Sequence, residues 1–258
     1  MAVHKAGRKA ARVAAAVALI SVAASACGPG DDDAKGGGRV SEKPAASSSD
    51  KSPDAGAPEA EAPSAASAQL ADVPASVKGG VITVGDPKAK HTVKIYEDPR
   101  CPFCKKFEDG GAQALVKPVT DGKVKVEYTI ASFLDNNLGG SGSVNAANAL
   151  RASVEAGKFP QFHAAVFANQ AADESDDAYT PAFLLKIADK VEGLRGGAFD
   201  KAVTNGTYKK WVGEAMEAFS ADGVKGTPTV FIDGKKTDSG ALYEQAAFAK
   251  ELKAKGIS

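Results

Sequence analysis

The chain has 258 residues, of which 43% are hydrophobic and 25% are charged, with 32 basic and 32 acidic residues in balance. Because this balance leaves no excess of positive charge, the composition does not favour nucleic-acid binding, and we expect no nucleic-acid partner. The chain contains only three cysteines, Cys27, Cys101 and Cys104, so it is not a disulfide-rich scaffold.

Residues 1–26 have the pattern of a secretion signal. A basic segment, which includes Lys5 and Arg12, precedes the apolar stretch 13–20, and that stretch is shorter than the ~20 residues that a transmembrane helix needs. These 26 residues hold four Lys or Arg and no Asp or Glu. Their removal would leave 28 basic and 32 acidic residues, a mildly acidic chain.

The signal ends in Ala24-Ser25-Ala26-Cys27, which resembles a bacterial lipobox, although Ala24 stands where leucine is usual. The resemblance implies that Cys27 receives lipid and anchors the protein on the extracytoplasmic face of the cell membrane. Two alternatives stay open: ordinary cleavage that leaves a free cysteine, or retention of the whole segment as an anchor. Residues 27–75 are rich in Gly, Ala, Ser, Pro and Asp, and we predict a disordered linker there.

One folded domain is predicted over residues 76–258, long enough to bury a sizeable core. Strands are predicted at 81–84, 91–97 and 124–130 from β-branched and alternating residues, and a helix begins at Pro102 and breaks at Gly110-Gly111. About 138–205 shows only helical spacing, including a capped start at Thr180-Pro181. A helix over 208–219, a strand after Pro228, a turn, a short strand and a closing helix over 242–252 complete the domain.

The stretch Cys101-Pro102-Phe103-Cys104 lies between the second predicted strand and the helix that follows it. A cysteine at a helix N-terminus is stabilised as a thiolate, which is the nucleophile of disulfide exchange. Positive charge from Arg100, Lys105 and Lys106 should stabilise this thiolate further. We therefore predict a Cys101 pKa of roughly 4.5–6. A zinc half-site is disfavoured because zinc needs about four ligands. We expect no metal, since neither His91 nor His163 stands at ligand spacing, and His163 is interpreted as a packed or partly exposed side chain.

A second motif, Gly226-Thr227-Pro228, opens an apolar strand. Proline cannot donate a hydrogen bond to the sheet at that position, and its presence is typical of a cis peptide bond kept for function.

Together the CPFC and GTP motifs resemble the thioredoxin superfamily, and more narrowly the DsbA-like thiol–disulfide oxidoreductases of the bacterial cell envelope. The resemblance implies an α/β, thioredoxin-like fold with a DsbA-like helical insertion. It also implies that Cys101 is the nucleophile, Cys104 the resolving cysteine and Thr227-Pro228 a cis pair facing them. Pro102, Phe103 and Thr227 would contact substrate. The resemblance further includes Asp98 and the segments 159–163 and 167–170.

The sequence departs from the family pattern at Ile95, where many relatives carry a buried acid that assists the proton of the second cysteine. Glu97 is a possible substitute, but we interpret it as a solvated carboxylate at the strand end.

The predicted function is therefore that of an extracytoplasmic thiol–disulfide oxidoreductase without a cofactor, introducing disulfides into reduced exported proteins through Cys101 and Cys104. A membrane redox partner would reoxidise it. The alternatives are a reductase or isomerase, or a lipid-anchored binding module in which the CPFC disulfide is only structural.

Overall fold

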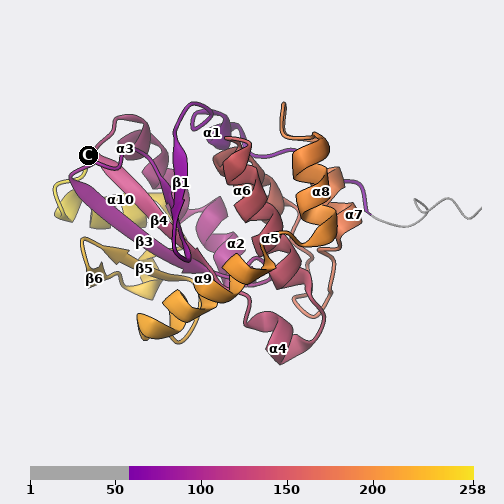
Figure 1. Cartoon of the computed structure of the whole chain (residues 1–258). Helices are drawn as coiled ribbons and strands as arrows, with labels where there is room; N and C mark the ends of the chain where they lie inside the picture. The colour runs from indigo at the N-terminus through magenta and orange to yellow at the C-terminus, as the bar shows by residue number, and fades with distance from the viewer. Residues whose placement is uncertain (1–57) are drawn as a thin grey trace, which may run out of the picture. The chain divides into compact units, whose positions relative to one another are not determined.

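The computed structural model describes residues 58–258, so the predicted signal and Cys27 lie outside the described residues. A six-stranded sheet of order β1-β2-β4-β3-β5-β6 crosses this part of the chain (Figure 1). Only β3 and β4 pair in parallel, and the other neighbours are antiparallel. The strands are β1 (Ala75–Lys78), β2 (Val81–Val84), β3 (His91–Glu97), β4 (Val124–Ile130), β5 (Thr229–Ile232) and β6 (Lys235–Lys236).

The parallel pair β3 and β4 is joined by three short helical segments. These are α2 (Pro102–Asp109), the 3-10 helix η1 (Gly111–Leu115) and α3 (Val116–Thr120). The predicted break at Gly110-Gly111 is confirmed, and packing explains it. A Cβ on Gly111 would lie 2.1 Å from the carbonyl oxygen of Leu242, so only glycine allows this approach.

Helices occupy most of the sequence between β4 and β5, as predicted. Figure 1 shows α5 to α8 gathered to the right of the sheet. Thr180 caps α7 by accepting a hydrogen bond from Phe183 N at 3.2 Å, as the sequence predicted. The remaining helices are α4 (Leu134–Leu138), α5 (Gly142–Glu155), α6 (Phe159–Ala168), α7 (Pro181–Ala188), α8 (Gly197–Asn205), α9 (Lys209–Ala221), the 3-10 helix η2 (Ser239–Ala241) and α10 (Gln245–Ala254).

The two faces of the sheet are covered by different helices. Side chains alternate along β3, so Ile95 and Glu97 share one face while Tyr96 points to the other. On the Tyr96 face, the ring of Phe219 from α9 lies 6.3 Å from that of Tyr96. On the Ile95 face, Tyr128 stands beside Ile95 in the register, and its ring lies 5.6 Å from that of Phe159 in α6. The side chain of Glu97 therefore lies on a face of the sheet that helices cover.

The prediction of a disordered linker over 27–75 is wrong for residues 58–75, because these residues pack against the domain. A short helix, α1 (Ala65–Ala68), lies there, and Ala60 is only 7% exposed. Glu61 N donates to Asn169 Oδ1 at 2.7 Å, and Asn169 Nδ2 donates to Glu61 O at 2.9 Å. Isolated apolar residues such as Leu70 suffice here because the domain already provides an apolar surface. Residues 27–57 lie outside the described part, and no helix within 58–258 is long and apolar enough to span a membrane.

Candidate functional site

The two cysteines of the CPFC motif lie at the start of α2, where the sequence predicted them. Cys101 is the N-cap residue, and its carbonyl oxygen accepts from Cys104 N at 3.0 Å and Lys105 N at 3.2 Å. Pro102 occupies the first turn, where a missing N–H costs no intrahelical bond. The backbone N–H groups of Phe103 and Cys104 therefore lie near the Cys101 sulfur at the helix start.

The two thiols have opposite environments. Hydrogen bonding from Cys104 lowers the pKa of Cys101 to about 6, and the backbone N–H groups of Phe103 and Cys104 add to this against the cost of burial. Burial raises the pKa of Cys104 well above its usual value, and its side chain is fully enclosed. Cys101 is also largely buried, with 7% of its surface exposed. Cys101 therefore ionises readily to the nucleophilic thiolate, whereas Cys104 stays a protonated thiol.

The Thr227-Pro228 segment faces Cys101, as predicted. The Thr227–Pro228 bond is cis, and the Cys101 thiol donates to Thr227 O at 3.4 Å. Beside them lies a hollow of 350 Å³, lined from Asp222 to Thr229 and by Phe231 and Lys236. The hollow borders the loop that carries Pro228, and neither Cys101 nor Cys104 lines it.

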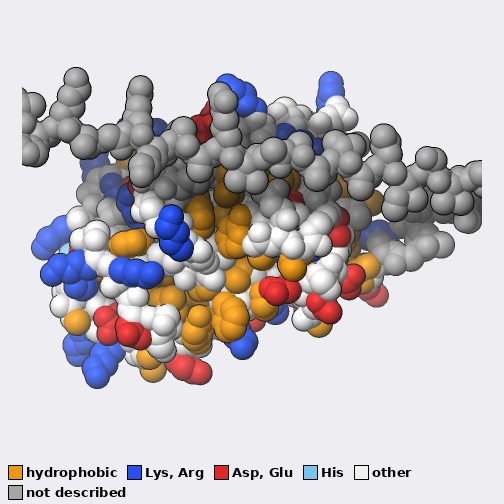
Figure 2. All heavy atoms as spheres, turned by 90° about the horizontal axis from the view of Figure 1, so that it is seen from below, with side chains coloured by type: hydrophobic (Ala, Val, Ile, Leu, Met, Phe, Trp, Pro, Cys, Tyr) orange, Lys and Arg blue, Asp and Glu red, His pale blue; other side chains and the backbone are white. Residues whose placement is uncertain are grey.

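Figure 2, which views the molecule from below Figure 1, shows hydrophobic side chains gathered near the centre of this face. Within the described residues, the large hydrophobic side chains that are exposed are Phe103 at 51% and Leu138 at 38%. Phe103 stands between the two cysteines, and its ring lies 6.1 Å from that of Tyr243. An exposed aromatic ring next to a nucleophile suits contact with an apolar segment of another chain.

Arg100 does not act on Cys101 as the sequence analysis expected, because its charge is used elsewhere. Its side chain is only 2% exposed, and Nη1 binds Asp135 Oδ1 at 2.9 Å and Gly139 O at 2.7 Å. Its Nη2 donates to Glu174 O at 2.9 Å. The lysines are also engaged elsewhere. Lys105 Nζ donates to Phe167 O at 3.0 Å, and Lys106 Nζ lies over the Phe103 ring. Hydrogen bonds, not these cations, lower the pKa of Cys101.

The helical insertion holds the turn between β3 and α2 from outside. Asp98 is fully buried and accepts from Ser143 Oγ at 2.6 Å and from Leu134 N at 3.1 Å. Burial nevertheless raises the pKa of Asp98 to about 6. Gln170 Nε2 donates to the carbonyl oxygens of Pro99, at 2.7 Å, and Cys101, at 3.0 Å. Asp98 and Gln170 belong to the segments that carried the family resemblance, and both contact this turn.

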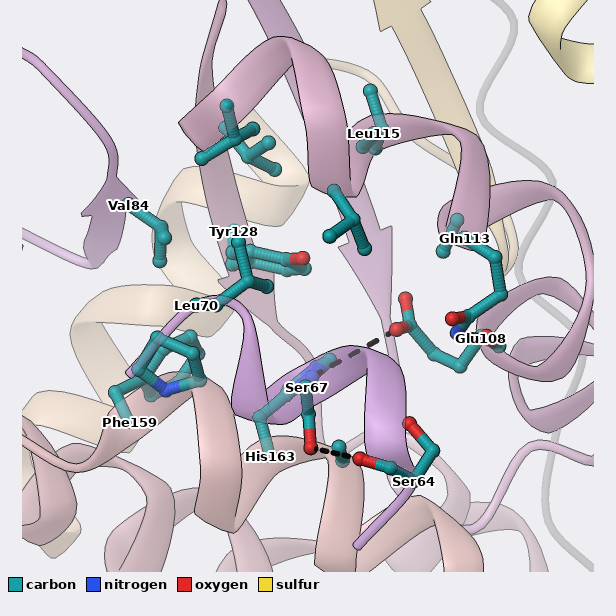
Figure 3. Close-up of a pocket in the computed structure, with 16 residues that line it drawn as sticks. Ser64, Ser67, Leu70, Val84, Glu108, Gln113, Leu115, Tyr128, Phe159 and His163 are labelled. Atoms are coloured by element: carbon teal, nitrogen blue, oxygen red, sulfur yellow. Dashed lines mark hydrogen bonds and ion pairs between the residues drawn. The ribbon is translucent and has the colours of Figure 1, made fainter. Parts of the chain in front are cut away.

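A second cavity, of 50 Å³, is lined by residues of α1, α2, η1, α3, β4 and α6 (Figure 3). Apolar side chains, among them Leu70, Leu115 and Phe159, form most of its wall. Glu108 and His163 supply polar groups to the same wall, and Figure 3 shows their side chains pointing toward each other.

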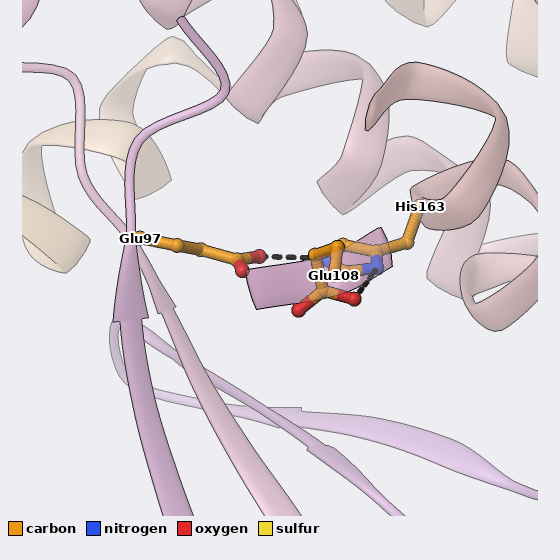
Figure 4. Close-up of side chains that lie close together, drawn as sticks. All are labelled: Glu97, Glu108 and His163. Carbon is orange, nitrogen blue, oxygen red and sulfur yellow. Dashed lines mark hydrogen bonds and ion pairs between the residues drawn. The ribbon is translucent and has the colours of Figure 1, made fainter. Parts of the chain in front are cut away.

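Glu97, Glu108 and His163 form a buried cluster that the sequence analysis missed (Figure 4). His163 Nε2 lies 2.5 Å from Glu97 Oε1, and its Nδ1 lies 3.8 Å from Glu108 Oε2. Burial raises the pKa of Glu97 well above its usual value, raises that of Glu108 to about 8, and lowers that of His163. Within residues 58–258, these three side chains form the group of His, Cys, Asp or Glu residues that could hold a metal ion.

The interpretation of Glu97 as a solvated carboxylate is wrong, since its side chain is fully buried. The two-residue period of β3 was the available signal, because it puts Glu97 on the same face as Ile95. Glu108 follows the buried Cys104 by four residues on α2, which also places it on the inner face. His163 is packed at 4% exposure, as predicted, but its partners come from distant segments. Ile95 itself is fully buried and apolar.

Comparisons with known proteins agree with this geometry. The model of a family described as Thioredoxin matches residues 77–250. The reduced form of the disulfide bond oxidoreductase DsbG from Mycobacterium tuberculosis superposes with a TM-score of 0.52 and 27% identity, covering 66% of this chain and 81% of its own. MdbA, a thiol–disulfide oxidoreductase from Actinomyces oris, superposes with a TM-score of 0.57 and 26% identity, covering 69% and 90%.

A curated sequence relative has a different name. It is a Na⁺/H⁺ antiporter, NhaA 3, from Salinispora tropica, 27% identical over 156 residues. The matched region makes up 59% of this chain but only 21% of that protein, so the chain spans about a fifth of the relative's length.

Proposed function

Since the chain belongs to the thioredoxin family, we propose that it catalyses thiol–disulfide exchange and introduces disulfides into exported proteins. The observation that carries this proposal is the opposite displacement of two neighbouring thiol pKa values, with Cys101 lowered to about 6 and Cys104 raised. The names of the two solved relatives support it, since both are oxidoreductases of disulfides.

The reaction begins with the Cys101–Cys104 disulfide. A substrate thiolate attacks the Cys101 sulfur, a mixed disulfide forms, and Cys104 leaves and takes up a proton. A second substrate thiolate attacks the substrate sulfur of this mixed disulfide, and Cys101 leaves as a thiolate. The substrate loses two electrons and the enzyme gains them. A leaving thiol with a pKa of about 6 makes the last step fast and favours oxidation of the substrate.

Substrate contact is assigned to the residues around the Cys101 sulfur. Phe103 offers an exposed ring, and Pro102 and Thr227 border the approach to the sulfur. Pro228 has no N–H, so the loop leaves room for an extended substrate backbone to pair beside it.

The reduction potential of the purified protein decides the direction of exchange. Equilibration with glutathione buffers should give a value between those of thioredoxin and DsbA, about −270 and −120 mV. Oxidised protein should also form disulfides in a reduced, unfolded substrate, and Cys101→Ser should abolish this. A potential at or below that of thioredoxin would identify a reductase instead. A disulfide that resists dithiothreitol would favour the structural alternative.

The proposed location is the outer face of the cell membrane. Ala24-Ser25-Ala26-Cys27 after a basic, apolar leader supports lipidation at Cys27. A lipid-anchored oxidase would be reoxidised by a membrane partner that accepts two electrons. The wild type should fractionate with membranes, and Cys27→Ser should release or misprocess it. Recovery of the wild type as a wholly soluble, unlipidated protein would contradict this location.

A further inference from the structure

We propose that Glu97, Glu108 and His163 form a binding site for one divalent transition-metal ion of the zinc type. The three side chains come from different elements: Glu97 ends β3, Glu108 belongs to α2, and His163 belongs to α6. Each contributes one donor atom, and the three atoms lie within 4.8 Å of one another (Figure 4). His163 now faces Glu97 with Nε2 and Glu108 with Nδ1, so the side chains would rearrange around one ring nitrogen to reach the bond lengths of about 2.0–2.2 Å that zinc forms with nitrogen and oxygen.

Unused donor atoms point to a missing ligand. Glu97 Oε2 and Glu108 Oε1 are buried, and neither has a hydrogen-bond partner among residues 58–258. The Glu97 side chain is completely enclosed and extends from the strand end toward the imidazole ring of His163 (Figure 4). A buried carboxylate oxygen without a partner is costly, so such an atom needs either a proton or a cation.

The charge of the site favours a dication. Two carboxylates share a single imidazole, and within the described residues neither forms a salt bridge with a lysine or an arginine. Lys105, which is close to Glu108 in the sequence, pairs with Asp109 and the Phe167 carbonyl instead. One divalent ion would balance the two carboxylates while His163 remains neutral, the form in which imidazole binds metal.

The cavity beside the cluster provides room for a further ligand. Glu108 and His163 line this 50 Å³ space together with residues of α1 (Figure 3). That volume exceeds the roughly 10–15 Å³ that a single water requires. A water there would supply a fourth coordination position, and the cavity would be the route by which the ion enters.

The donor set also selects the class of ion. Imidazole together with carboxylates suits Zn²⁺, Co²⁺ or Mn²⁺, whereas Ca²⁺ and Mg²⁺ prefer sites made of oxygen alone. This site differs from the CPFC thiols and does not depend on the proposed redox function.

Zinc titration of the full chain tests the proposal, provided that the cysteines are excluded. The protein is held in its Cys101–Cys104 disulfide form and carries Cys27→Ser, because free thiolates would bind zinc themselves. Calorimetry should detect one equivalent of Zn²⁺. Glu108→Gln and His163→Gln should each weaken binding at least tenfold. His91→Gln, which removes an imidazole that pairs with Asp233 far along the chain, should leave the affinity unchanged.

Two further readouts keep the test decisive if a variant fails to fold. Zn²⁺ should raise the melting temperature of the oxidised wild type, and equal concentrations of Ca²⁺ should not. Co²⁺ should give visible absorption bands typical of nitrogen and oxygen ligands, without sulfur charge-transfer bands. The proposal is overturned if the oxidised protein binds no Zn²⁺, if Ca²⁺ binds more tightly, or if only His91→Gln reduces the affinity.

Discussion

The sulfur of Cys101 lies 3.4 Å from the carbonyl oxygen of Thr227, a residue 126 positions further along the chain. This contact joins the start of α2 to the start of β5, so the nucleophile stands between a helix end and a loop that substrate can reach. The contact also ties the chemistry of Cys101 to the packing of both segments.

Ionisation of Cys101 is the first measurable consequence of the site. Because the pKa of Cys101 is lowered to about 6, alkylation of the reduced protein should rise with pH and reach half its maximum near pH 6. Cys104→Ala removes the largest stabilising contribution and should move this midpoint upward. A midpoint near the ordinary thiol pKa in the wild type would contradict the geometry.

The same lowered pKa predicts how stability varies with pH. The folded, reduced protein holds fewer protons than its unfolded chain between about pH 6 and the ordinary value of 9.0. The stabilisation of the folded state by the Cys101 thiolate is therefore present at high pH and is lost as the pH falls through about 6. The melting temperature of the reduced form, minus that of the disulfide form, should rise over this window. A flat difference would refute the assignment.

The residue between the cysteines should tune the reduction potential. Phe103 offers the Cys101 thiolate no side-chain hydrogen bond or charge, whereas a histidine there would offer both. Phe103→His should lower the Cys101 pKa by about one unit, worth ~1.4 kcal/mol, and raise the potential by about 30 mV. Phe103→Leu serves as the control and should leave the potential unchanged. A Phe103→His variant no more oxidising than this control would show that the position is not limiting.

Arg100 should matter for stability and not for the thiolate. Its guanidinium is buried against Asp135, so Arg100→Met leaves a carboxylate unpaired and should cost about 3–5 kcal/mol in urea unfolding. Arg195→Met, which removes exposed pairs with Asp189 and Asp200, should cost at most about 1 kcal/mol. The alkylation midpoint of Cys101 should stay near pH 6 in a folded Arg100→Met protein. A clear rise would restore the direct electrostatic role predicted from the sequence.

Limited proteolysis tests the corrected boundary of the domain. Residues 58–75 pack on α6 and the core, so a broad-specificity protease should spare them under native conditions. Mass spectrometry of the products identifies the cut positions. Asn169→Ala removes the two hydrogen bonds to Glu61 and should make the segment easier to cleave. Rapid cleavage between 58 and 75 in the wild type would support the original boundary.

Local patterns predicted most of the fold. The strand at 91–97 was predicted from its β-branched and aromatic residues, the strand at 124–130 from its alternation, and the break at Gly110-Gly111 from its glycines. The placement of Cys101 at a helix start followed from the strand, the proline and the helix around it. Each of these features depends on neighbours within a few residues, which is the range over which sequence patterns are informative.

Features set by distant contacts could not be predicted. Arg100 looked like a stabiliser of Cys101, yet its partner Asp135 lies 35 residues away and removes its charge from the site. Glu97 looked exposed at a strand end, but α6 covers it through His163, 66 residues further along. The residues from 58 to 75 are polar enough to resemble a linker, and only an apolar surface supplied by the domain orders them.

The contacts of Asp98, Arg100 and Gln170 have a consequence for dissecting this protein. Ser143 and the 170s segment belong to the helical insertion, yet they hold the backbone on which Cys101 stands. Removing the insertion would take Ser143 from the buried Asp98 and both Gly139 and Glu174 from the buried Arg100. The insertion is thus no detachable module, and a version trimmed to the minimal sheet and its flanking helices would lose the redox turn along with it.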